Sequence, residues 1–238
     1  MIFVPSWVIP GTYLENLQFL EDKPEIAGVE LLFFLDTRET RALLSAEFEA
    51  LERYASRFIF TAHLPDLLEE SQEELVSRLA PLVRHFVCHP GPLGGVEAQG
   101  GRIRAWGERF GPERFVVENT VPGALEAILP WLFPETPVCM DTGHLLLEGA
   151  SPAGFFRRYG GRIREIHLHG VDYAGALGDG RLPDHRAFRR EEPWFQALGP
   201  VLADFGGVLN VEIFSWPEAE RTLAALGFRE EPGLFRFR

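Results

Sequence analysis

The sequence is poor in cysteine and in positive charge. Only two of its 238 residues are cysteine, which excludes a disulfide framework and indicates a reducing compartment. Asp and Glu outnumber Lys and Arg by 35 to 23, giving a formal net charge of −12. Because contacts to nucleic-acid phosphates need a basic footprint, this balance argues against a nucleic-acid partner and favours a small-molecule substrate.

Long hydrophobic runs and targeting signals are also missing. The longest apolar runs, such as Val29 to Leu35, are too short to span a bilayer. The first residues carry neither a charged segment nor a long apolar one, so no signal peptide is evident. The sequence therefore predicts a cytoplasmic protein with no membrane partner. It also lacks GxGxxG after the first strand and any GxxxxGKS or GxxxxGKT pattern, which disfavours nucleotide-binding doubly wound folds.

Short apolar, β-branched or aromatic runs alternate with helical patterns along the whole chain, about 25 to 30 residues apart, the spacing of strand–helix units. The predicted strands are Ile2–Val8, Val29–Phe34, Phe58–Ala62, Phe86–Cys88, Phe115–Glu118, Val138–Met140, Ile163–Leu168 and Val208–Ile213. Eight such units favour a closed (β/α)₈ barrel, and no linker or composition shift divides the chain, so residues 1–238 are expected to form one domain. Its longest connections, Pro90–Arg102 and Gly170–Arg186, are expected to serve the active site.

The ionisable residues follow the predicted strands. Six of the seven histidines lie at a strand end or just after it; His85, where a helix runs into the fourth strand, is the exception and is assigned a structural role. Carboxylates inside apolar strands are costly unless they are paired or coordinated. In a barrel all strand carboxyl ends converge on one rim. The predicted metal ligands are His63, His89, Glu118, Asp141, His144, His167, Asp184, His185 and Glu212.

Imidazole and carboxylate groups without thiolates suit zinc, manganese, iron or cobalt. Cys88 has the opposite side-chain parity to His89 and is expected to face the helices, whereas Cys139 shares the parity of Asp141 and is expected inside the barrel, in the core. Glu30 is predicted to contact the substrate, and so is His169, although ligation by His169 stays open.

These residues resemble the xylose-isomerase-like, or AP endonuclease family 2, TIM-barrel superfamily over essentially the whole chain. The motifs that carry the resemblance are Asp141-Thr-Gly-His144, Glu118-Asn119-Thr120, His167-Leu168-His169-Gly170 and Glu212 on the last strand. The sugar isomerases and epimerases of that superfamily imply one metal held by Glu118, Asp141, His167 and Glu212.

Endonuclease IV, in the same superfamily, implies three zinc ions. Its plan adds histidines after strands three and four, the His of the Asp-x-x-His motif and an Asp-x-His after strand seven. This sequence offers His63, His89, His144 and the pair Asp184-His185, which are adjacent instead of separated by one residue. Neighbouring side chains on extended backbone point to opposite faces, so Asp184 and His185 are not both expected to coordinate. This departure from the pattern affects the ligands of the third metal.

His89 favours the multinuclear plan, with two or three divalent ions and zinc preferred. Zinc clusters suit phosphoester hydrolysis, with Glu118 as bridging carboxylate and Glu118 and Glu212 as the candidate catalytic residues. The acidic balance then predicts a small-molecule phosphodiester as substrate. The segments PSWVIPGTYLENLQFL and VELLFF also resemble cobamide-remodelling phosphodiesterases, which implies cleavage of the nucleotide loop of a cobamide.

Three alternatives stay open. A ketose isomerase or epimerase would use one Mn, Mg or Co with Glu118 and Glu212 as acid and base, and Glu30 and His169 as hydroxyl contacts. A DNA repair endonuclease would need a basic groove and wedge residues, for which arginines such as Arg186 and Arg189 in the later units are the only candidates. A non-enzymatic binding barrel would need none of these ligands.

Overall fold

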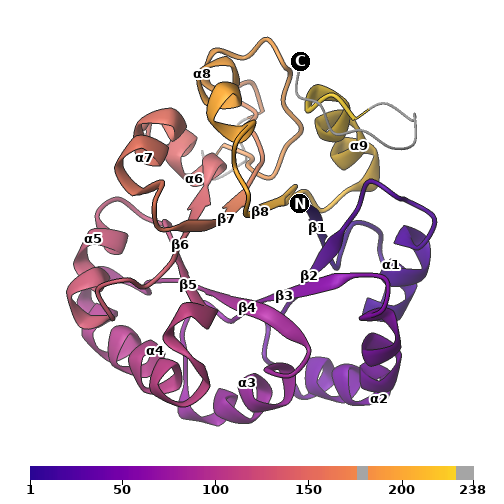
Figure 1. The fold of residues 1–238 in the computed structure, drawn as a ribbon, viewed down its shortest axis with the longest axis vertical. Coiled ribbons are helices and arrows are strands. Elements are labelled where there is room, and N and C mark those ends of the chain that lie inside the picture. The colour runs from indigo at the N-terminus through magenta and orange to yellow at the C-terminus, as the bar shows by residue number, and fades with distance from the viewer. Residues whose placement is uncertain (176–181, 229–238) are drawn as a thin grey trace.

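The computed structural model describes residues 1–175 and 182–228. Eight parallel strands close into one barrel in the order of the sequence, with β8 paired to β1, and helices surround it (Figure 1). The predicted single-domain (β/α)₈ barrel is confirmed. Residues 176–181 of the long connection Gly170–Arg186 lie outside the described residues.

The strands are short and almost wholly buried. They are β1 Ile2–Pro5, β2 Gly28–Leu32, β3 Ile59–His63, β4 Val83–Cys88, β5 Phe115–Glu118, β6 Val138–Asp141, β7 Ile163–His167 and β8 Val208–Asn210. Continuous apolar runs suit them, because one face of each parallel strand packs on the helices and the other on the barrel interior.

Three strand boundaries differ by three residues from those that the sequence predicts, and several others differ by one or two. β1 stops at Pro5, where the chain enters a turn. β8 ends at Asn210, since the N–H of Ile213 bonds back to the Val211 carbonyl at 2.9 Å and the chain leaves the sheet. β4 begins earlier than predicted, so His85 lies inside that strand and not ahead of it.

Amphipathic helices cover the outside of the barrel. They are α1 Tyr13–Leu20, α2 Arg38–Tyr54, α3 Glu73–Leu79, α4 Val96–Phe110, α5 Ala124–Ile128, α6 Thr142–Leu147, α7 Pro152–Tyr159, α8 Pro193–Leu202 and α9 Trp216–Ala225. Polar caps start several of them: Thr12 and Glu15 form a capping box on α1, and Ser151 caps α7. Asp141 caps α6 with the carboxylate that also ends β6, which fixes that side chain at the rim.

Side-chain parity separates two buried layers. Cys88 belongs to the large core between the strands and the helices, as predicted. Cys139 packs with Val87 and Val116 in a separate small cluster, which agrees with the predicted position inside the barrel. Burial raises the pKa of the Cys139 thiol well above its ordinary value.

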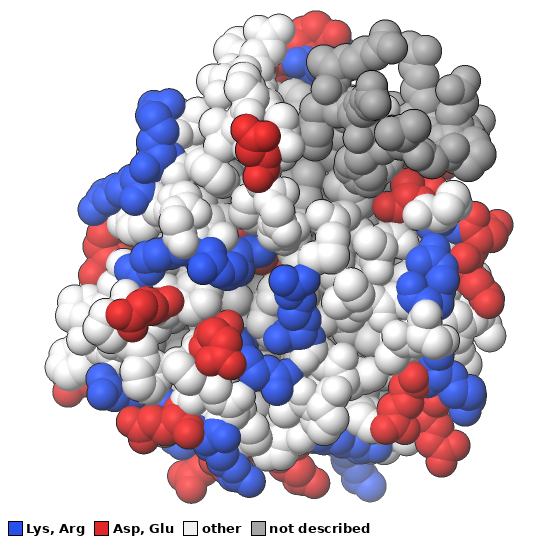
Figure 2. Space-filling view, in the orientation of Figure 1, with Lys and Arg blue, Asp and Glu red and all other residues white. Residues whose placement is uncertain are grey.

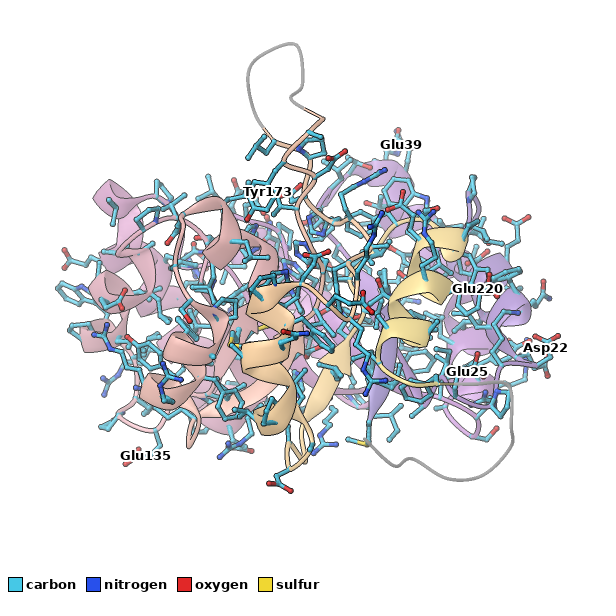
Figure 3. The ribbon with its side chains drawn as sticks, turned by 90° about the horizontal axis from the view of Figure 1, so that it is seen from above. Asp22, Glu25, Glu39, Glu135, Tyr173 and Glu220 are labelled. Carbon is cyan, nitrogen blue, oxygen red and sulfur yellow. The ribbon has the colours of Figure 1, made fainter. Side chains whose placement is uncertain are left out.

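The two ends of the barrel can be told apart by the residues that follow and precede the strands. Glu39 and Tyr173, which follow strands, lie at the upper side of Figure 3, and Glu135, which precedes one, lies at the lower side. The upper side is therefore the carboxyl end of the strands, where barrel enzymes place their active sites. No helix in the described residues has the length and apolar character needed to cross a membrane.

Candidate metal centre

Strand ends place four of the predicted ligands at one level of the barrel. His63, Glu118, Asp141 and His167 are the last residues of β3, β5, β6 and β7, and Asp141 stands opposite His167 in the register of the sheet. All four side chains are at most 1% exposed. Residues up to 104 positions apart in sequence are thus brought together by the closure of the sheet.

Glu118 lies at the centre of the cluster. Its Oε2 is 3.1 Å from His63 Nε2, 3.5 Å from His89 Nε2 and 3.4 Å from His167 Nδ1. Its Oε1 is 3.4 Å from His144 Nδ1. One carboxylate therefore faces four imidazoles from β3, β7, α6 and the connection after β4.

A second group of donors surrounds His167. Its Nδ1 is 3.2 Å from Glu212 Oε2 and 3.9 Å from Asp141 Oδ2. Together with Glu118 these residues form the set that the sequence predicts for a single metal ion. His63 and His89 form a different set with Glu118, so the two sets share that carboxylate.

Only some of the ligands predicted for a third metal ion lie close together in the described residues. His185 lies within 3.6 Å of Glu212 Oε2, and its ring stacks on His169 with centroids 4.2 Å apart. His185 adopts a left-handed backbone with φ of 50°, which turns it toward the cluster. Asp184 makes no contact with these ligands in the described part of the chain. Of the adjacent pair, His185 is the one that the structure brings to the centre.

The donor spacing fits divalent metal ions. Ligands about 2.1 Å from a tetrahedral ion are separated by about 3.4 Å, and the gaps around Glu118 and His167 cluster near this value. Both ring nitrogens of His167 and Glu212 Oε2 are buried without a hydrogen-bond partner in the described residues. Buried polar atoms are rarely left unpaired, so these atoms call for a ligand. The residues present therefore fit a divalent metal.

The surrounding charges hold the carboxylates ionised. Burial alone would raise the pKa of Glu118, but His167 and His89 outweigh it and hold the pKa well below the ordinary value. The pKa of Asp141 is lowered in the same way, with His144 and His169 overcoming the effect of burial. Ionised carboxylates are the form that binds metal.

Metal binding is expected to release protons. Burial lowers the pKa of His89, yet Glu118 and Asp66 outweigh it and raise the pKa to about 10; Asp141 and Glu118 raise that of His144 to about 9. Both imidazoles are then protonated at pH 7 without metal and must become neutral to coordinate, so we expect release of at least two protons and affinity that increases with pH. Zinc titration calorimetry in buffers of different ionisation enthalpy measures this release. An identical heat in every buffer would contradict it.

The two residues predicted to contact substrate are deeply buried. Glu30 is 0% exposed; its Oε2 accepts a hydrogen bond from Asn210 at 2.6 Å and its Oε1 lies 3.4 Å from His167 Nε2. His169, also 0% exposed, has Nε2 3.0 Å from Asp141 Oδ2 and accepts from the His185 N–H at Nδ1. Both contacts hold other residues of the site in place, and substrate contact by either stays a prediction.

Several residues of the site were not predicted from the sequence. Asp66 lies 2.9 Å from His89 Nδ1 and orients that ring. Glu165 accepts a very short hydrogen bond from His85 inside the barrel and lies 3.9 Å from His167 Nε2. The alternation in Ile163–His167 could have revealed Glu165, which shares the parity of His167. Asp66 carries no such signal, because it lies in a loop.

Two aromatic rings border the cluster. Phe34 packs edge-on against His63 with centroids 4.5 Å apart, and Phe214 lies 4.7 Å from His185. The two phenyl rings are 6.4 Å apart and nearly perpendicular, although they follow β2 and β8. They give the metal centre an apolar edge on one side.

Comparison with known proteins supports the fold. No family model matches the chain, and no curated protein sequence matches it either. Among solved structures, the probable 3-DHS dehydratase AsbF from Bacillus anthracis, involved in petrobactin synthesis, matches with a TM-score of 0.68 at 15% identity, over 96% of this chain and 99% of its own.

Two further structures show the same likeness. An L-ribulose 3-epimerase matches with a TM-score of 0.62 at 15% identity, over 98% of this chain and 88% of its own. Endonuclease IV from Thermus thermophilus matches with a TM-score of 0.53 at 18% identity, over 95% and 98%. The resemblance to xylose-isomerase-like TIM barrels is thus confirmed for the fold, and the barrel carries buried His, Glu and Asp clusters suited to a divalent metal.

Proposed function

We propose that this protein is a metal-dependent hydrolase of a small-molecule phosphodiester, with two or three divalent ions, zinc preferred. The observation that carries the proposal is the position of Glu118 between two donor sets. His63 and His89 form one set with its carboxylate, and Asp141, His167 and Glu212 complete the other. A one-metal enzyme needs only the second set.

The residues of the two sets would have different roles in hydrolysis. Bound ions would supply Lewis acidity and lower the pKa of water at the site. Glu118 would be a ligand common to both sets, and the neighbouring His167 and His89 keep it ionised against the effect of burial. Glu212 has its pKa lowered because His167 and His185 outweigh the effect of burial, so it is ionised and suited to be a metal ligand and not a proton donor.

The rim of the barrel favours a substrate with an apolar body. Large apolar side chains are exposed in each of the eight segments that follow a strand. A single exposed apolar residue needs no explanation, so the proposal rests on all eight together. The exposed residues are Trp7, Leu35, Leu67, Leu93, Val121, Leu147, Tyr173 and Phe214. Their distribution around the entrance supports a broad, partly apolar substrate. A cobamide, whose nucleotide loop contains a phosphodiester, is the substrate that we propose to test first.

The first test is metal stoichiometry by plasma mass spectrometry on untagged protein, followed by turnover assays of the zinc-loaded enzyme. We expect two or three ions per chain, hydrolysis of a model phosphodiester, and higher kcat/KM for cobamides than for small phosphodiesters. Loss of one ion in His89→Ala, with the others retained, would support a separate metal position formed by His63, His89 and Glu118. Absence of phosphodiester hydrolysis in a fully loaded enzyme would exclude the proposal.

A one-metal sugar isomerase or epimerase is the second candidate. An L-ribulose 3-epimerase and a 3-keto-D-glucoside 4-epimerase are among the proteins with the same fold. In this case Glu118 and Glu212 would act as acid and base on opposite sides of a sugar carbon. One manganese or cobalt ion per chain and turnover of a ketose would favour it.

A further inference from the structure

We propose that the opposite end of the barrel contains a second binding site, which takes a small organic phosphate of about the size of a nucleoside monophosphate. A cavity of about 750 Å³ lies there. Its lining includes the first residues of strands and the segments just before them, among them Arg84, His85, Arg114, Ile163 and Gly207. The metal centre is built from strand carboxyl ends, so the two sites occupy different ends of the barrel.

Three arginines supply the positive charge of this cavity. Arg84, Arg114 and Arg164 line it together with two carboxylates, those of Glu113 and Asp204. Figure 2 looks onto this end of the barrel and shows Lys and Arg side chains at its left and centre, with Asp and Glu side chains among them. In a chain of net charge −12, an excess of positive charge in one cavity is unusual and indicates an anionic ligand.

The arginines keep free donors. Within the described residues, Arg114 donates only from Nη2, to the carbonyls of Ala80 and Val83, and Arg164 donates only from Nη1, to the carbonyls of Gly161 and Ile163. The hydrogen bond of Arg84 in the same part of the chain is to the Met1 sulfur. None of the three forms an ion pair with a carboxylate in residues 1–175 and 182–228. The remaining planar N–H groups are suited to bidentate binding of phosphate oxygens.

His85 gives the cavity a buried polar wall. It is 4% exposed and lines the cavity, and Glu165 holds its Nε2. Its Nδ1 has no hydrogen-bond partner within the described residues and is not sealed off from solvent, so it is available to a ligand as a donor or acceptor.

The size and the apolar part of the lining define the rest of the ligand. A volume of about 750 Å³ lies within the usual range for small-molecule sites and exceeds what inorganic phosphate would fill. Phe156 and Phe205 line it with ring centroids 6.0 Å apart in an edge-to-face pair, and Val201 adds a further apolar surface. The body of the ligand would pack on these side chains while its phosphate binds the arginines.

The test is calorimetric titration of the full-length, zinc-loaded protein with adenosine 5′-monophosphate and, separately, with inorganic phosphate. We expect one nucleotide per chain at this site and weaker binding of inorganic phosphate. Arg84→Gln and Arg164→Gln, made singly, should each weaken nucleotide binding by about tenfold to a hundredfold, since hydrogen bonds to charged groups are lost. Arg53→Gln, an exposed arginine on α2 away from the cavity, is the matched control and should bind as the unchanged protein does.

A variant of the metal centre separates the two sites. Asp141→Asn should lose the metal ion that Asp141 helps to hold, yet retain nucleotide binding at the arginine cavity. Binding that disappears in Asp141→Asn and persists in both arginine variants would place the nucleotide at the metal centre and overturn the proposal. Absence of binding, or equal affinity for inorganic phosphate, would overturn it as well. None of these results depends on whether the protein hydrolyses a phosphodiester.

Discussion

Glu118→Gln is expected to remove most of the bound metal and to lower turnover on the order of 10³-fold. Its carboxylate lies within 3.5 Å of His63, His89, His144 and His167 nitrogens, so it belongs to both donor sets. Glutamine has nearly the same shape, but its neutral amide is a weak metal ligand. The measurements are metal content by plasma mass spectrometry and kcat with the best substrate found.

A matched control tests whether the loss of metal and turnover is specific to the site. Glu97→Gln makes the same chemical change on the exposed surface of α4 and should leave metal content and turnover unchanged. A protein with Glu118→Gln that retains two ions and full activity would contradict the shared position of this carboxylate. Loss of stability with metal and turnover retained would show that Glu118 has only a structural role.

Removal of metal is expected to lower the melting temperature by about 8–16 °C. Glu30, Glu118, Asp141 and Glu212 lie within the barrel at most 2% exposed, and their negative charges need compensation there. An ion present at about a thousand times its Kd stabilises the fold by about 4 kcal/mol, and each kcal/mol shifts the melting temperature of a domain of this size by about 2–4 °C. Thermal unfolding with and without a chelator measures the shift.

The control for this experiment is Glu118→Gln, which lacks the carboxylate common to both donor sets. Its melting temperature should change much less with the chelator, because most of its metal is already lost. Equal melting temperatures for the chelated and metal-loaded forms of the unchanged protein would show that the cluster does not bind metal strongly enough to affect folding.

Much of the architecture follows from local patterns in the sequence. Alternating apolar runs and helical segments predict eight strand–helix units, because each parallel strand needs a helix to cover it. Side-chain parity places Cys88 outside and Cys139 inside the barrel, since successive side chains of a strand point to opposite faces. The positions of His63, Asp141 and His167 at strand ends predict a cluster, because the strands of a barrel share one rim.

The sequence does not give the contacts that complete each site. Asp66 comes from a loop, and only the folded chain brings it to His89; the same is true of Phe34 and Phe214, which are 180 residues apart and 6.4 Å apart between ring centroids. His85 is the third residue of β4, whose first residue depends on hydrogen bonds to neighbouring strands and not on local composition.

The sequence by itself determined the fold, the rim that carries the ligands and the chemical type of the site, because these depend on periodicity and residue type. Only the tertiary structure decided that Glu118 stands between two donor sets, that His185 and not Asp184 turns toward the cluster, and that arginines line a cavity at the other end of the barrel. Those features depend on distances between segments remote in sequence, which closure of the barrel fixes.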